Sequence, residues 1–276
     1  MPPPASYLDL ALSVLNSGAP DSKCEAARTA GEMVQSASVS FEPQASEFPD
    51  RPARPKNPKL VSPRLLKKRS LGTQSGRAAL LHAVAHIELN AIDLAFDMAG
   101  RFAGEISEMG LNTDQFIADW FNVGQEEAFH FSMINQRLGE LGSGYGDLDA
   151  HDGLWQAAMD TSDSVLARLA IAPLVLEARG LDVTPGMISR LETVGDKISA
   201  DLLRVIYRDE VGHVEVGTKW FLLICREKDL DPGTTFQDLV AKRFRSGLKG
   251  PFNVEARERA GMPGIFYGSD AQFSSN

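Results

Sequence analysis

The chain has 276 residues, of which 43% are hydrophobic and 24% are charged. These values are typical of a globular protein and exclude disorder throughout. The net charge of −9 makes the chain as a whole a poor general binder of nucleic acids or anionic membranes. No stretch of about 18 uninterrupted apolar residues indicates a transmembrane helix. The start lacks the features of a secretory signal, and two cysteines, Cys24 and Cys225, make no disulfide framework. We therefore expect a cytoplasmic protein.

Segments rich in Ala, Leu, Glu and Arg predict an all-α fold. The first 75 residues are expected to hold one or two helices within 5–36, with a break at Gly18 to Pro20, followed by a proline-rich linker over 37–63 that wraps the surface. The central part, 76–230, is expected to be a bundle, and 231–276 a C-terminal extension with a helix near 235–246. The expected bundle elements are helices at 77–103, stopped by Gly104; at 113–141, capped by Asn112 or Thr113; at 153–179, ending before Gly180; at 186–194; and at 196–227. Residues 180–185 are expected to follow an irregular path.

Acidic residues interrupt the apolar stripe of each long predicted helix. A charge in such a stripe is costly unless a cation neutralises it. Two helices carry Glu-x-x-His, whose spacing places both side chains on one face, and two carry a single Glu. The set is Glu88, Glu127 with His130, Glu177, and Glu210 with His213.

This ligand set is that of a carboxylate-bridged di-iron or di-manganese four-helix bundle. Four glutamates balance two divalent cations, and oxygen-rich ligation with one imidazole per metal suits iron or manganese better than zinc. Glu88 and Glu127 are equally far from a turn near residue 108, and Glu177 and Glu210 from one near 194, so antiparallel hairpins bring each pair level. Glu127 and Glu210 are the expected bridging ligands. A single Glu-x-x-His on a helix is more often a solvated pair. The prediction of a metal site therefore depends on the order Glu, Glu-x-x-His, Glu, Glu-x-x-His over four helices.

Longer motifs extend the pattern. They are the runs 85–95, Glu126-Glu127-Ala128-Phe129-His130-Phe131, Tyr145-Gly146-Asp147, 150–155, 176–182, Arg208-Asp209-Glu210-Val211-Gly212-His213 and Pro251-Phe252-Asn253. Over most of the chain, these motifs resemble the bacterial DUF455 family of the ferritin-like superfamily. The family is similar to the MiaE-like di-iron monooxygenases, which hydroxylate the isopentenyl group of a modified adenosine in tRNA. The resemblance implies a ferritin-like bundle, two iron ions and a small-molecule or modified-nucleoside substrate. The proline-rich N-terminal segment and the break at 180–185 depart from that pattern.

The expected activity is that of an O₂-dependent hydroxylase or monooxygenase. One alternative is an iron-handling or peroxide-reducing protein, and another is a non-catalytic metal-stabilised binding module. An external electron donor is expected, because the chain has no rubredoxin-type cysteine pairs. Binding of tRNA would need a local basic patch, and charge runs are more often solvated. The two candidate patches are Arg51, Arg54, Lys56, Lys59, Arg64, Lys67, Lys68 and Arg69, and Lys242, Arg243, Arg245 and Lys249.

Further residues have both a structural and a functional interpretation. Tyr207 could place a hydroxyl beside the metals, but it and Trp120 are more simply core residues. His82 and His86 lie off the face of Glu88 and are expected to be structural or to support a ligand. His151 is expected to fix a loop or cap a helix.

Overall fold

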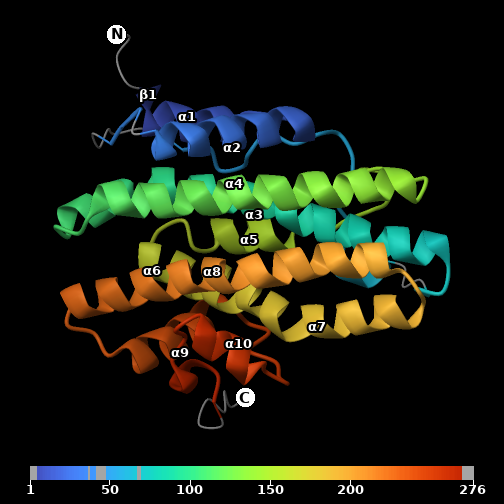
Figure 1. Cartoon of the computed structure of the whole chain (residues 1–276). Coiled ribbons are helices and arrows are strands. Elements are labelled where there is room, and N and C mark those ends of the chain that lie inside the picture. Colours follow the sequence, from blue (N-terminus) through green and yellow to red (C-terminus); the bar gives the residue numbers. More distant parts are fainter. Residues whose placement is uncertain (1–4, 37, 42–47, 67–69, 269–276) are drawn as a thin grey trace.

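The computed structural model describes residues 5–36, 38–41, 48–66 and 70–268 (Figure 1). Helices dominate this part of the chain, which confirms the all-α prediction. A two-residue parallel pairing joins Ala5 to Val39 and Ser6 to Ser40. The elements in chain order are β1 (Ala5–Ser6), α1 (Tyr7–Leu15), α2 (Pro20–Gln35), β2 (Val39–Ser40), η1 (Pro63–Leu65), α3 (Gln74–Glu108), α4 (Thr113–Glu140), α5 (Gly153–Met159), α6 (Val165–Ile171), η2 (Ala172–Glu177), α7 (Ala178–Thr193), α8 (Lys197–Glu227), α9 (Pro232–Arg243), α10 (Val254–Arg259) and η3 (Gly264–Phe266).

The long helices pack in layers (Figure 1). Helix α3 lies along α4, η2 and α7 lie along α8, and α4 and α8 hold the two pairs together. Helices α1 and α2 cover α3 and α4 on one side, while α9 and α10 cover α6, α7 and α8 on the other. Most buried apolar residues from α1 through to η3 form one continuous core, and Leu15, Leu94, Trp155 and Ala158 form a smaller second cluster. The three-part division of the chain remains a prediction.

Helix α3 is longer than the sequence indicated. Thr73 begins it by accepting a hydrogen bond from the backbone of Gly76, and the helix passes through Gly104, where it was expected to stop. A glycine inside a helix costs only about 1 kcal/mol, and the chain turns instead at Gly110, whose φ of 69° is in the left-handed region. By length and hydropathy alone α3 could cross a membrane, but 78% of its apolar window is buried inside the molecule, as in a core helix.

The expected helix at 153–179 is divided. Helix α5 ends at Met159, and α6 begins at Val165 after a turn, with Ser164 as its cap. The next turn, η2, is a π-helix that begins at Ala172, directly before Pro173. Proline has no N–H to donate, and a π-type turn is one local adjustment that accommodates such a break.

The expected break at 180–185 is absent, because α7 runs through both Gly180 and Pro185. Inside a helix, Pro185 leaves the carbonyl four residues earlier, that of Leu181, without its usual donor. The side-chain amide of Asn253 donates to that oxygen at 3.1 Å. The C-terminal segment therefore supplies the hydrogen bond that the proline removes.

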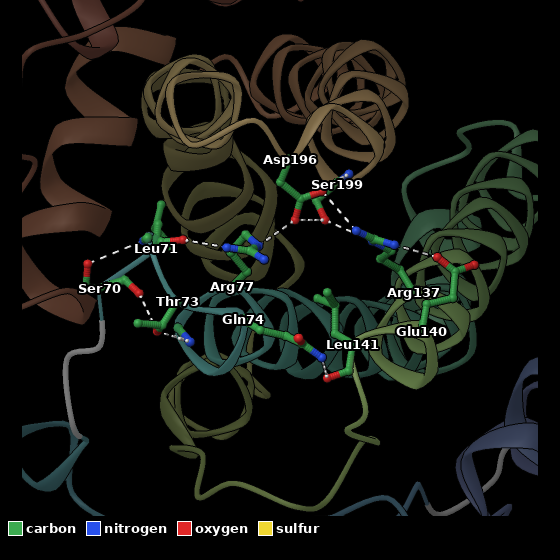
Figure 2. Close-up of polar contacts among 12 residues, drawn as sticks. Ser70, Leu71, Thr73, Gln74, Arg77, Arg137, Glu140, Leu141, Asp196 and Ser199 are labelled. Atoms are coloured by element: carbon green, nitrogen blue, oxygen red, sulfur yellow. Dashed lines mark hydrogen bonds and ion pairs between the residues drawn. The ribbon is translucent and has the colours of Figure 1, made fainter.

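One end of the molecule is fastened by the carboxylate of Asp196, the N-cap of α8 (Figure 2). It binds Arg77 from the start of α3 at 3.1 Å and Arg137 from the end of α4 at 3.0 Å. It also accepts from Ser199 at 2.8 Å. Although burial raises the pKa of Asp196, these hydrogen bonds from Ser199 and Arg137 lower it overall. Three helix ends are thus held in register.

The described part of the linker contacts α5 and α3. The indole of Trp155 donates to the carbonyl of Asp50 at 2.8 Å. Arg54 enters the interior, where it donates to Asn90 at 2.8 Å and pairs with Asp93 at 3.0 Å. Arg54 therefore serves the fold and is not part of an exposed basic patch.

Candidate metal centre

Two groups of buried side chains converge between the helices. Among the described residues, Glu88, Glu127 and His130 form one group and Glu127, Glu210 and His213 form the other. Within each group one donor atom per residue lies within 4.8 Å of the others. These groups could hold a metal ion, and Glu127 belongs to both. The fold thus brings together five of the six predicted ligands, from α3, α4 and α8.

Both imidazoles turn Nδ1 toward the carboxylates. His130 Nδ1 lies 3.2 Å from Glu88 Oε2 and 3.4 Å from Glu127 Oε2. His213 Nδ1 lies 3.0 Å from Glu127 Oε1 and 3.8 Å from Glu210 Oε2. The ring centroids of the two histidines are 5.8 Å apart. Each ring therefore contacts one carboxylate that the other ring does not, Glu88 for His130 and Glu210 for His213, and both rings contact Glu127.

Four carboxylate oxygens at this centre lack a hydrogen-bond donor among the described residues. Within the described part of the chain, no donor meets hydrogen-bond geometry at Glu88 Oε2, Glu127 Oε1, Glu177 Oε2 or Glu210 Oε2, and His213 Nδ1 is likewise unsatisfied. The 3.0 Å approach of His213 to Glu127 is thus a close contact without a well-formed hydrogen bond. A buried polar atom without a partner costs about 1–3 kcal/mol. Several of them aimed at one volume fit a cation in that volume.

Glu177 ends η2 and stands apart from both groups. It is half-buried, and its Oε2 is fully buried. Burial and the charge of Glu127 raise the pKa of Glu177 to about 7, although His213 opposes this. The sixth predicted ligand therefore interacts electrostatically with Glu127 and His213 but lies outside the 4.8 Å groups.

The electrostatics of the centre follow from burial and mutual repulsion. Burial, and then the charge of Glu127, raise the pKa of Glu88 to about 8 and that of Glu210 well above its usual value. Although burial opposes ionisation, the carboxylates raise the pKa of His130 to about 11 and that of His213 as well. Glu127 has a lowered pKa despite burial, because both imidazoles face it. Without a metal, the centre retains protons at neutral pH.

The outer nitrogen of each histidine contacts a further carboxylate, which sequence reasoning missed. His130 Nε2 lies 3.2 Å from Asp209, and His213 Nε2 lies 2.9 Å from Glu126. Such contacts orient ligating imidazoles and fix their tautomer. Each partner directly precedes the glutamate of the other Glu-x-x-His motif, so the doublets Glu126-Glu127 and Asp209-Glu210 were the available signal.

Other predicted candidates have structural positions. The Tyr207 hydroxyl accepts from Asn253 at 2.9 Å, so its contact is with the C-terminal segment. Trp120 is buried against Phe116, with ring centroids 6.4 Å apart, as expected of a core residue.

The remaining histidines fix the loop before α5. His86 Nδ1 is 2.8 Å from the Tyr145 hydroxyl, and His82 Nε2 accepts from the backbone of Gly146 at 3.0 Å. His151 Nδ1 accepts from the backbone of Gly153 at 3.1 Å, at the N-terminus of α5.

The first candidate basic patch is only partly a surface feature. Arg54 is engaged inside the molecule, and Arg51 pairs with Asp152 at 2.7 Å. Lys56 and Lys59 are exposed, and so is Arg64. The last three members of the patch, at 67–69, lie outside the described residues.

Comparison with known proteins places the chain in a family without assigning an activity. The family model described as "Protein of unknown function (DUF455)" matches residues 16–268. An uncharacterized protein of Haemophilus influenzae (strain ATCC 51907 / DSM 11121 / KW20 / Rd) is 42% identical over 210 residues, which cover 76% of this chain and 73% of that protein. No solved structure matches significantly.

Proposed function

We propose that this chain, which belongs to the DUF455 family of proteins of unknown function, is a ferritin-like di-iron protein with an O₂-dependent oxidoreductase activity. The observation that carries the proposal is the position of Glu127 in both buried groups. A carboxylate shared by two Glu/His groups is the arrangement expected of a bridged pair of metal ions. The pairing of α3 with α4 and of α7 with α8 supports a four-helix bundle of the ferritin-like type.

The residues divide naturally between two metal positions. Glu88 and His130 would hold one ion, Glu210 and His213 the other, and Glu127 would bridge them. Glu177 would complete the set on the side of His213. The second predicted bridge, Glu210, belongs to one group only, so Glu127 is the stronger candidate. The oxygen-rich donor set favours iron, with manganese as the alternative.

The protein groups around the centre have roles that follow from their contacts. A reduced iron pair supplies O₂ activation for attack on a C–H bond. Asp209 and Glu126 hold the two imidazoles in place. The near-complete burial of Glu88, Glu127 and His130 would restrict water at the centre. The glutamates and imidazoles would exchange their protons for the metals on loading.

Electrons must come from another molecule. Cys225 is buried in α8 and Cys24 is half-buried in α2, and neither belongs to a cysteine pair spaced for an electron-transfer metal. The substrate is a small molecule or a modified nucleoside, with the isopentenyl adenosine of tRNA as the candidate that the MiaE-like resemblance suggests. A cytoplasmic location agrees with two unpaired thiols.

Metal analysis of anaerobically purified protein, followed by O₂ uptake with a chemical reductant, tests the proposal. We expect two iron or manganese ions per chain and reductant-dependent O₂ uptake. Glu127→Ala should lose both metals, because both groups depend on it. Glu215→Ala, an exposed residue five positions after Glu210 on the same helix, is the matched control and should retain them.

Other outcomes of these experiments would contradict the proposal or favour an alternative. Two metals retained in Glu127→Ala would refute the assignment of the centre. Metals without O₂ uptake would refute the oxidoreductase. Net storage of added iron, or consumption of peroxide in place of O₂, would favour the iron-handling alternative, and metals that only raise the melting temperature would favour a binding module.

A further inference from the structure

A basic hollow, lined by none of the predicted metal ligands, lies between α5 with the turn that follows it and the end of α9. It has a volume of about 620 Å³, within the range of pockets that bind small molecules. Lys242, Arg243 and Arg245 line one side, and Asp160 and Asp163 line the other. In a chain with a net charge of −9, such a gathering of cations is a local exception.

A second, apolar hollow adjoins the first. It measures about 130 Å³, and the two share Phe244 and Ser246 in their walls. Leu248 and Phe252 from the loop after α9 face Val175 and Leu176 of η2 there. The aromatic ring of Phe252 is held by Arg257, whose guanidinium carbon lies 4.9 Å from the ring centroid. One end of the combined cleft is therefore basic, and the other is apolar.

The charges of the combined cleft are not balanced internally. Its walls contain six basic and three acidic side chains: Lys242, Arg243, Arg245, Lys249, Arg179 and Arg257, and Asp160, Asp163 and Asp182. Two of the three carboxylates already have cations, since Asp163 pairs with Arg243 at 2.7 Å and Asp182 with Arg257 at 2.8 Å. Asp160 accepts from Gln156 at 3.0 Å.

Several cations of the cleft remain available for a ligand. Among the described residues, no acidic side chain forms an ion pair with Lys242, Arg245 or Lys249, and the first two line the larger hollow. Arg243 is held in place by two contacts, to Asp163 and to the carbonyl of Asp160 at 2.9 Å. A fixed guanidinium beside two cations that form no ion pair suits the oxygens of a phosphate group.

We propose that this cleft binds a small phosphate ester, with the phosphate at Lys242, Arg243 and Arg245 and an apolar or aromatic group in the hollow lined by Phe244 and Leu248. The proposal does not depend on the metal centre. The two sites are nevertheless adjacent in the chain, because Leu176 and Arg179, which line the apolar hollow, flank Glu177 on the same stretch of helix. A bound ester would therefore press on the turn that presents Glu177.

Equilibrium binding to two phosphate esters tests the proposal. Adenosine 5′-monophosphate and n-hexyl phosphate carry the two kinds of apolar group, and adenosine and n-hexanol are their phosphate-free counterparts. We expect at least one ester to bind with one molecule per chain, and its counterpart to bind at least about tenfold more weakly. The double variant Lys242→Gln with Arg245→Gln should weaken the binding of that ester by about tenfold or more.

The control removes the same charge elsewhere. Lys56→Gln with Lys59→Gln changes two exposed lysines of the linker, and should leave the affinity unchanged. Because Lys242 and Arg245 are exposed, both double variants should keep the melting temperature of the parent protein. Equal loss in both double variants, or millimolar or weaker binding of both esters, would overturn the site. Binding of a single-stranded RNA without binding of either ester would overturn the assignment to a small ligand.

Discussion

Helix α3 buries carboxylates on two opposite faces, and among the described residues only the carboxylates of one face pair with lysine or arginine. On the outer face, Asp93 pairs with the buried Lys23 and with Arg54, while Asp97 pairs with Arg101 and the buried Arg168. Glu88 lies nine residues before Asp97, which is two and a half helical turns, and so faces the other way. Its ion-pair contact is with His130.

The ion-pair partners of the acids indicate the role of each face of α3. Lysine and arginine that come from α2, the linker and α6 neutralise the outer acids, so these acids fasten the covering segments to α3. At the inner face, the oxygens of Glu88, Glu127 and Glu210 have no lysine or arginine among their ion-pair partners in the described residues. Buried carboxylates that have only histidines, which are themselves potential metal ligands, as partners indicate a site for a metal cation.

The sharpest test uses one acid from each face and expects effects of opposite sign. Asp97→Asn should lower the free energy of unfolding by about 3–5 kcal/mol, because Arg168 then stays buried with a weakened partner. It should leave metal binding intact. Glu210→Gln should leave the metal-free protein as stable or make it more stable, because burial already raises the pKa of this carboxyl. It should greatly weaken metal binding.

Urea unfolding of both variants, with and without added metal, makes this comparison. Added metal should stabilise the parent protein and Asp97→Asn but have little effect on Glu210→Gln. If Glu210→Gln destabilised the metal-free protein as strongly as Asp97→Asn does, the inner acids would be structural groups like the outer ones.

Metal affinity should rise with pH, because Glu88 and His130 retain protons in the metal-free centre. The pKa of Glu88 is about 8 and that of His130 about 11 in the metal-free centre. Both exceed neutral pH, so a metal must displace protons, and acidification favours the protonated, metal-free state. The apparent dissociation constant should fall at least about tenfold per unit between pH 6 and 8. Competition with a chelator, corrected for its own protonation, measures this slope, which should be shallower in Glu88→Gln. A pH-independent affinity would contradict proton displacement.

The carboxylates behind the histidines should have smaller effects. Asp209→Asn and Glu126→Gln keep the shape of the side chain but weaken its hold on His130 and His213. Loss of such a contact usually costs 10–100-fold in metal affinity (~1.4–2.8 kcal/mol). Isothermal titration with a divalent metal checks this, with Glu215→Gln as the control. An unchanged affinity in both variants would mean that the bundle alone positions the rings.

The ligands on the inner face of α3 and on the helices opposite it could be predicted from sequence, because their spacing along the chain indicates which of them lie together. An i, i+3 spacing puts Glu127 beside His130, and equal distances from a turn bring Glu88 level with Glu127. The outer face carried a signal too, since Asp93 and Asp97 interrupt an otherwise apolar helix at i, i+4. Their partners could not be identified, because Lys23, Arg54 and Arg168 come from distant segments whose path the pattern does not specify.

The unbroken course of α7 was unpredictable for the same reason, and it leads to the smallest expected effect. Pro185 predicts a break unless another group satisfies the Leu181 carbonyl, and that group, Asn253, is 68 positions after the proline. Asn253→Ala should cost about 1–2 kcal/mol, because the carbonyl loses its donor and α10 loses its N-cap. Tyr207→Phe removes only the hydroxyl contact to Asn253 and should cost less.

The double variant Asn253→Ala with Pro185→Ala should recover part of the loss of unfolding free energy, measured by urea unfolding, because the helix then supplies an N–H to the Leu181 carbonyl. No recovery would mean that Asn253 acts through its cap alone.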